Sequence, residues 1–218
     1  MNSPQTEIKI DPPVAGERLV LHACCGPCSL QPFKILRDAG WDITIMYSNS
    51  NIYPEAEFDR RFDTLETWAN ENNITLIKDN YDEDEWAARV KPLGEAPQNT
   101  PERQARCGEC YKLRLEHAAK FAKATDVKYL SSTLAVSPYQ YYEELKAQLD
   151  AVCKEYFLNP VLMDFRPFYS QATQESRDAG MYRQKYCGCE FSYRESMDQF
   201  QKNGNEKYLR ELLSITRS

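Results

Sequence analysis

Short apolar runs alternate with helix-like segments along the chain, and this alternation restricts the fold more than any other feature of the sequence. The runs "RLVLHA" (18–23), "DITIMYS" (42–48), "NITLIKD" (73–79) and "VKYLSSTL" (127–134) are rich in β-branched or aromatic residues and predict strands. Strands that alternate with helices pair in parallel through right-handed crossovers. The sequence therefore predicts an α/β fold with a Rossmann-like parallel sheet and additional C-terminal helices.

The helices between these strands are predicted from apolar periodicity and from capping residues. Ser29 is suited to begin the first helix and Gly40 to end it. A helix within residues 54–72 is expected to bury one face, made of Phe58, Phe62, Leu65 and Ala69. A further helix over residues 107–123 is predicted to start at a pair of cysteines.

The chain of 218 residues, 42% of them hydrophobic, is long enough to bury a substantial core. We expect residues 18–218 to form a single α/β domain that carries the functional site, and residues 1–17 to be a flexible N-terminal extension. These first residues lack a basic segment followed by an apolar one, and no later stretch approaches ~18 uninterrupted apolar residues. We therefore expect a cytoplasmic protein with no membrane partner.

Eight cysteines are the main chemical feature of the sequence. In a reducing compartment, grouped cysteines more often bind metal or carry out redox chemistry than form structural disulfides. Cys153 stands apart on an amphipathic helix and is predicted to be a buried, inert thiol. The other seven form three groups, which are Cys24/Cys25/Cys28, Cys107/Cys110 and Cys187/Cys189.

The positions of these groups suggest a common site. Ligands of open parallel sheets bind beyond the carboxyl ends of the strands, and the first group directly follows the first predicted strand. Cys107 and Cys110, at a predicted helix start next to Arg106, are expected to be thiolates and thus suited to bind metal. Gly26 is the only glycine between residues 17 and 39, so a phosphate-cradling ATP loop is not expected there.

Three kinds of site use the cysteines differently. Thioredoxin-type exchange matches Cys25-Gly26-Pro27-Cys28 but leaves five grouped thiols unused. Structural zinc in a nucleic-acid-binding module needs four ligands and leaves three thiols at a strand end. An iron–sulfur cluster held by four cysteines, together with a redox pair or a second metal, accounts for all seven.

The charge of the chain is uneven. The formal net charge is −6, but residues 99–125 hold six basic against three acidic side chains, and residues 166–194 hold five against three. Both segments contain a cysteine pair, and the rest of the chain carries −11. An anionic substrate that reaches the cysteines would therefore be attracted locally, although ordinary helix surfaces would give the same pattern.

The sequence resembles the cobalamin-independent epoxyqueuosine reductases of the QueH type. The resemblance runs in family order over about residues 18–195 and is carried by "HACCGPCS" (22–29), "SNSNIYPEAEFDRR" (48–61), "RCGECYKLRL" (106–115), "SSTLAVSPYQ" (131–140), "MDFRP" (163–167) and "YRQKYCGCEFS" (182–192). It implies a sheet of the adenine-nucleotide α-hydrolase type and an iron–sulfur enzyme. The implied reaction is the last step of queuosine formation, in which the epoxide of a modified tRNA wobble base is reduced to an alkene by electrons from an external donor.

The resemblance also implies roles for the cysteines. Cys24, Cys25, Cys107 and Cys110 would hold a [4Fe–4S] cluster, and Cys187 and Cys189 would form a redox-active pair, with Cys28 also at the catalytic site. In a second assignment, Cys28, Cys189 and one of Cys24 or Cys25 hold a separate iron, and Cys187 joins the cluster ligands. Sequence spacing does not decide between the two.

Several other residues are candidates for less specific roles. His22 is either a partner of the cysteines or a core histidine, and His117 is expected to be structural. Asp164, a tyrosine or a water is a candidate proton donor. The candidates for base stacking are Tyr139, Tyr141 and Tyr142, and those for phosphate contacts are Arg60, Arg61, Arg183, Lys185 and Arg194.

Overall fold

The strands of the protein lie side by side in one parallel sheet. The computed structural model describes residues 12–215, and within this range five strands pair in the order β3-β2-β1-β4-β5. Leu19 of β1 pairs with Ile43 of β2 on one side and with Tyr129 of β4 on the other. The strands are β1 (Arg18–His22), β2 (Asp42–Tyr47), β3 (Thr75–Lys78), β4 (Tyr129–Ser132) and β5 (Asn159–Pro160). This confirms the predicted Rossmann-like α/β sheet, and the strand order reverses between β1 and β4.

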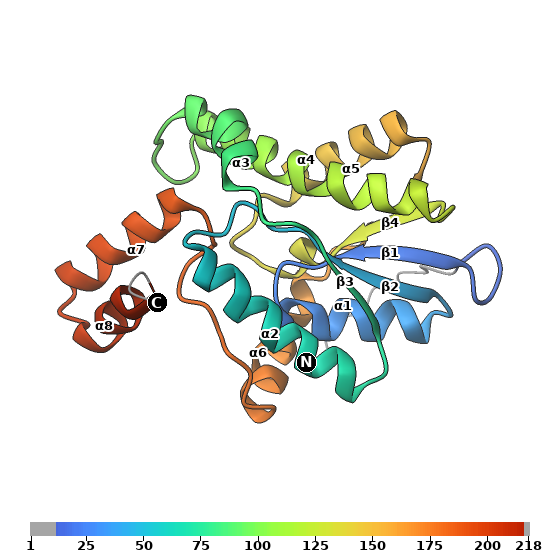
Figure 1. Ribbon diagram of the computed structural model, residues 1–218, viewed down its shortest axis with the longest axis horizontal. Helices are drawn as coiled ribbons and strands as arrows, with labels where there is room; N and C mark the ends of the chain where they lie inside the picture. The colour runs from blue at the N-terminus through green and yellow to red at the C-terminus, as the bar shows by residue number, and fades with distance from the viewer. Residues whose placement is uncertain (1–11, 216–218) are drawn as a thin grey trace, which may run out of the picture.

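Helices cover both faces of the sheet (Figure 1). α3, α4 and α5 lie on one face, and α1, α2 and α6 lie on the other. The bounds are α1 (Gly26–Asp38), α2 (Glu55–Glu71), α3 (Glu83–Val90), α4 (Pro101–Ala124), α5 (Tyr142–Tyr156), α6 (Tyr169–Asp178), α7 (Glu190–Lys202) and α8 (Glu206–Ile215), with short 3-10 turns at Lys91–Leu93, Thr133–Val136 and Arg166–Phe168. No helix of the described part is both long and apolar enough to cross a lipid bilayer.

The central strand is buried on both faces. Leu19, Val20 and Leu21 of β1 are inaccessible to solvent, which explains why this run is apolar throughout rather than alternating. The predicted inner face of α2 packs against the same core, since Phe58, Phe62, Leu65 and Ala69 are all buried. Complete burial of each large apolar side chain stabilises the fold by about 1.5–3 kcal/mol. The core therefore holds the strand ends, and the loops that follow them, in fixed positions.

Three boundaries differ from the sequence-based expectations. Ser29 does not cap α1, which begins at Gly26 after the extended Cys25, and its hydroxyl instead donates to the Cys25 carbonyl at 2.8 Å. α4 begins at Pro101, where the Thr100 hydroxyl accepts a hydrogen bond from the Arg103 amide, so the cysteine pair lies well inside the helix. β5 was not predicted, because two residues are too short to give a pattern. Gly40, with φ of +104°, does follow the end of α1 as expected.

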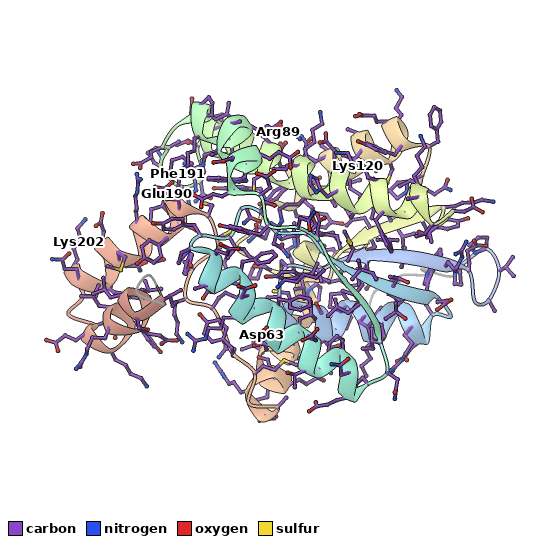
Figure 2. All side chains as sticks on the ribbon, in the orientation of Figure 1. Asp63, Arg89, Lys120, Glu190, Phe191 and Lys202 are labelled. Atoms are coloured by element: carbon purple, nitrogen blue, oxygen red, sulfur yellow. The ribbon has the colours of Figure 1, made fainter. Side chains whose placement is uncertain are left out.

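The C-terminal helices extend the fold beyond the sheet. Figure 2 shows Glu190 and Phe191 at the start of α7 next to the helices that cover one face, and Lys202 at its far end, away from the sheet. The Phe191 ring lies 6.0 Å from that of Trp86 in α3. The prediction of a single domain over residues 18–218 stays a prediction. Of the extension predicted for residues 1–17, residues 1–11 lie outside the described part.

Candidate metal centre

The seven grouped cysteines lie in three places: after β1 and at the start of α1, within α4, and in the loop that leads into α7. Cys24 and Cys25 come directly after β1, and Cys28 lies in the first turn of α1. The Cys24 amide donates to Thr133 Oγ1, just after β4, at 3.3 Å. The site is therefore at the point where the strand order reverses, which is the expected ligand site of such a sheet.

Cys24, Cys25 and Cys28 form a tight triad. Their three Sγ atoms all lie within 4.8 Å of one another, and those of Cys24 and Cys25 are 3.8 Å apart. Hydrogen bonds from the other two thiols lower the pKa of Cys24, whereas the hydrogen bond to Cys24 raises the pKa of Cys25 to about 12. The pKa of Cys28 is raised for the same reason.

The remaining four grouped cysteines form a second set. Burial is the main cause that raises the pKa of Cys107, followed by the negative charges of Cys187, Cys110 and Cys189. Burial likewise raises the pKa of Cys110 to about 12, and it raises that of Cys189. The expectation that a helix N-terminus keeps Cys107 and Cys110 as thiolates is thus wrong, because α4 starts at Pro101 and the macrodipole acts mainly within the first turn. Burial therefore disfavours the thiolate forms of these cysteines.

A buried ion pair holds the loop that carries Cys187. Arg61 and Glu57 of α2 are 2% and 0% exposed, and Arg61 Nε lies 2.7 Å from Glu57 Oε1. The other guanidinium nitrogens of Arg61 donate to the carbonyls of Cys187 at 3.0 Å and of Tyr186 at 3.2 Å. Arg61 is therefore wrong as a phosphate contact, since its charge is used inside the protein.

The glycine between the last two cysteines permits a close approach of this loop to α2. Gly188 has φ of +148°, and a Cβ atom there would lie 3.1 Å from Asn51 Nδ2 and 3.3 Å from Arg61 Nη1. Its carbonyl accepts a hydrogen bond from the Tyr53 amide at 2.9 Å. Cys189 then caps α7, and the Ser192 hydroxyl donates to the Cys189 carbonyl at 2.8 Å. Both cysteines are thereby fixed relative to α2.

His22 is a structural histidine of the core. Its Nε2 lies 3.1 Å from the Ser48 carbonyl, which can only accept, so Nε2 carries the proton and Nδ1 accepts from Ser132 at 2.9 Å. Burial, and then the charge of Arg114, lower the pKa of His22 to about 3. A neutral imidazole thus links β1 to the ends of β2 and β4. His117 is also structural, since it pairs with Asp79 at 2.7 Å and with Glu85 at 2.9 Å.

A cavity of about 70 Å³ opens beside Cys28. It is bordered by α1, the Thr133–Val136 turn, α6 and the loop that precedes Cys187. Its lining consists of Pro27, Cys28, Val136, Tyr169, Ala172, Thr173, Arg183 and Gln184. Tyr139, which is 78% exposed, places its ring 6.0 Å from that of Tyr169 near the cavity. Of the three tyrosines expected to stack on a base, only Tyr139 is exposed, while Tyr141 and Tyr142 are half-buried.

Two glutamines next to the cysteines were missed by the sequence analysis. Gln184 Nε2 donates to Cys25 Sγ at 3.2 Å, and Gln140 Nε2 donates to Cys187 Sγ at 3.5 Å. Gln140 ends the motif "SSTLAVSPYQ", and Gln184 lies in the motif "YRQKYCGCEFS". Because their side chains are uncharged, the charge pattern of the sequence did not mark them as candidates. Such donors stabilise a sulfur that carries negative charge.

Cys153 lies apart from the grouped cysteines, and Asp164 is unsuited to the role of proton donor. Cys153 is fully buried in α5, as expected, and burial raises the pKa of its thiol to about 12. Asp164 accepts two hydrogen bonds from the Arg166 side chain, at 2.7 and 2.6 Å, and these lower the pKa of its carboxyl group. It is ionised near neutral pH and is a poor proton donor.

Comparisons with known proteins agree with the motifs. A family model described as "Epoxyqueuosine reductase QueH" matches residues 19–195. The epoxyqueuosine reductase QueH of Acinetobacter baylyi is 30% identical over 200 residues, which cover 90% of this chain and 88% of that protein. The protein of the same name from Histophilus somni is 29% identical over 210 residues, covering 94% of this chain and 84% of the relative.

One solved structure has a similar fold. The U34-tRNA thiolase NcsA from Methanococcus maripaludis, determined with its [4Fe–4S] cluster, matches with a TM-score of 0.50 and 13% identity, covering 95% of this chain and 74% of that chain. At this identity the likeness concerns the fold alone. It agrees with the expected α/β fold.

Proposed function

The chain belongs to the epoxyqueuosine reductase QueH family, and we propose that it reduces the epoxide of epoxyqueuosine at the tRNA wobble position to the alkene of queuosine. This is the last step of queuosine formation, and we place it in the cytoplasm. The observation that carries the proposal is the triad of Cys24, Cys25 and Cys28 after β1, whose three Sγ atoms lie within 4.8 Å of one another next to a cavity.

The cysteines fit an iron–sulfur centre. All are free thiols within the described residues, and a bound metal would favour the thiolate forms that burial, and then the charges of neighbouring cysteines, now disfavour at Cys107. Cys28 Sγ lies within 4.8 Å of the Sγ atoms of both Cys24 and Cys25, so Cys28 can share one metal ion with either of them. We therefore propose the second assignment, in which Cys28, Cys189 and one of the paired cysteines hold a separate iron and Cys187 joins Cys107, Cys110 and the other paired cysteine as ligands of a [4Fe–4S] cluster.

The chemistry of the reaction sets what the protein must supply. Two electrons and two protons convert the epoxide into the alkene and one molecule of water, so an external electron donor is required. When bound, the iron centre supplies electrons singly and can polarise the epoxide oxygen. Cys28 borders the cavity, so a substrate bound there would lie next to this cysteine. Arg61 and Gln140 position Cys187, and Gln184 positions Cys25.

We propose the Tyr169 hydroxyl as the proton donor. Burial, and then Tyr139, raise the pKa of Tyr169, so the hydroxyl keeps its proton near neutral pH, and its ring lines the cavity together with Cys28. Tyr169→Phe is expected to lower kcat by about 100-fold or more, as for other general acids. The iron and sulfide content should not change. Tyr139→Phe is the control, and equal rates for the two variants would assign the proton to another donor.

We propose that the rim of the cavity contacts the tRNA backbone through Arg183 and Arg60. Arg183 lines the cavity, and the exposed Arg60 stacks on Tyr182 at 3.7 Å from the ring centre. Arg183→Glu combined with Arg60→Glu should weaken tRNA binding and lower the slope of log K against log salt by about 0.7–0.9 for each phosphate that the variant no longer binds. Arg210→Glu in α8, 78% exposed, is the matched control. A double variant that binds like the control would rule out this rim.

The proposed function is tested on protein purified without oxygen. Iron, sulfide and zinc are measured per chain, and the protein is then incubated with a reductant and with tRNA that contains epoxyqueuosine. Digestion of the tRNA and mass spectrometry of its nucleosides should detect queuosine. Zinc in place of iron, or unchanged epoxyqueuosine in the presence of a fully assembled iron–sulfur centre, would contradict the proposal.

A further inference from the structure

Arg114 of α4 carries a buried charge that no carboxylate balances. Its side chain is 4% exposed, and Nη2 donates to the Asn49 side-chain oxygen at 2.5 Å. Its Nε atom is buried and has no hydrogen-bond partner, and no Asp or Glu among the described residues forms an ion pair with it. A buried ion without a counter-ion costs several kcal/mol. The fold therefore needs a negative charge at this place.

Arg61 of α2 shows how this protein balances a buried arginine when the position is structural. Its guanidinium, similarly inaccessible, lies 2.7 Å from the Glu57 carboxylate. Arg114 faces a neutral amide instead, and Asn49 Nδ2 in turn donates to the Ala23 carbonyl at 2.9 Å. Asn49 thus connects Arg114 to the residue that directly precedes Cys24 and Cys25. The Asn49 amide therefore positions the Arg114 guanidinium near the cysteines but, being neutral, does not balance its positive charge.

The charge of Arg114 reaches both sets of cysteines. Arg114 lies four residues after Cys110 in α4, so the two side chains share one face of the helix, and Asn49 links Arg114 to Ala23, which directly precedes Cys24. A second buried arginine of α4, Arg106, has the same character. It is 2% exposed, stacks on Phe191 at 4.3 Å and donates to the Gly94 carbonyl at 2.9 Å, again without an ion pair among the described residues. Two unpaired cations on one helix therefore flank the cysteines.

We infer that Arg114 is the fixed counter-charge of the iron–sulfur centre and raises its reduction potential. This inference rests on the iron–sulfur part of the proposed function. A centre held by thiolates is an anion, and it gains one further negative charge when it accepts an electron. A fixed cation in a dry interior stabilises the reduced form more than the oxidised form. Arg114 is thus a positioning residue that makes the centre easier to reduce, without contact with the substrate.

The test compares Arg114→Gln and Arg114→Lys in the reconstituted full-length protein. The midpoint potential is measured by anaerobic redox titration followed by visible absorption, and iron and sulfide are measured per chain. Arg114→Gln should shift the oxidised-to-reduced ratio at a fixed potential about tenfold towards the oxidised form, which is about 59 mV lower for a one-electron couple. Arg114→Lys, which keeps the charge, should lie close to the wild type. Lys112→Gln, on the same helix and 34% exposed, is the control that should not shift the potential.

The outcomes show whether Arg114 acts on the centre through its positive charge or through the shape of its side chain. If the glutamine variant fails to assemble the centre while the lysine variant assembles it, the charge is needed for assembly, which supports the inference. If both fold but neither assembles, Arg114 acts through its shape and the inference is wrong. Equal potentials in all variants, with full iron and sulfide, overturn the inference alone. Absence of iron and sulfide from the wild-type protein overturns the proposed cofactor together with it.

Discussion

Serine in place of Cys110 is expected to abolish assembly of the iron–sulfur centre and with it the reduction of epoxyqueuosine. Cys110 is buried in α4 and packs with Leu113 and Phe191, and its thiol lies within the electrostatic reach of Cys187 and Cys189. A serine hydroxyl is a poor substitute for a thiolate ligand. Turnover should fall by more than about 100-fold, since loss of an outer-shell partner of a metal ligand already costs 10–100-fold.

The measurement is iron and sulfide per chain, with turnover, in protein purified without oxygen. Cys107→Ser, one helical turn earlier, should behave in the same way. Cys153→Ala is the control, because this thiol is also buried but lies in the apolar core of α5 rather than with the grouped cysteines. Full iron, sulfide and activity in both α4 variants would show that α4 holds no part of the centre.

The same assay on Cys187→Ser separates the two assignments of the cysteines. If Cys187 is a cluster ligand, its replacement should lower the iron and sulfide content together. If Cys187 and Cys189 form a redox pair beside a cluster held by Cys24, Cys25, Cys107 and Cys110, the cluster should remain and turnover alone should fall. Unchanged turnover and iron would exclude both roles.

The sheet was predictable because the central strands β1 and β2 are mostly buried and apolar, and because β-branched or aromatic residues also occur in β3 and β4. β1 to β4 all lie within the predicted runs, and parallel pairing follows from the helices between them. The start of α4 was not predicted, although Thr100 followed by Pro101 is a typical N-terminal signal. The helix was instead predicted to begin at Cys107 and Cys110, which in fact lie inside α4 and share one of its faces. That error also reversed the expected direction of the pKa shifts of Cys107 and Cys110.

The grouping of the cysteines was predictable, but the residues that hold them were not. Three cysteine motifs in one chain indicate a common site whatever the strand order. In contrast, Glu57 and Arg61 at positions i and i+4 are spaced as in an ordinary surface pair of a helix. Only the packing of the Cys187 loop over α2 shows that this pair is buried. The unbalanced charge of Arg114 was not predictable either, because the sequence of a helix does not show whether a carboxylate faces a given arginine.

The burial of the Glu57–Arg61 pair leads to a second large expected effect, on stability. Arg61→Met should lower the free energy of unfolding by about 3–5 kcal/mol, because it leaves the Glu57 carboxylate buried without its cation. For a chain of this size, each kcal/mol corresponds to about 2–4 °C in Tm. The same change removes the donors to the carbonyls of Tyr186 and Cys187. Chemical denaturation measures the loss of stability, and iron content measures the effect on the cysteine loop.

The double variant Glu57→Gln with Arg61→Met tests whether the uncompensated charge is the cause. Glutamine at position 57 keeps an oxygen that can accept the hydrogen bond from the Tyr182 hydroxyl, which is 2.8 Å long in this structure, but it removes the negative charge. The double variant should therefore recover part of the stability that Arg61→Met loses, while the two loop carbonyls remain without their donors. Iron content should stay low in both variants if the ion pair also positions Cys187. A double variant as unstable as the single one would mean that the missing hydrogen bonds, and not the buried carboxylate, account for the whole effect.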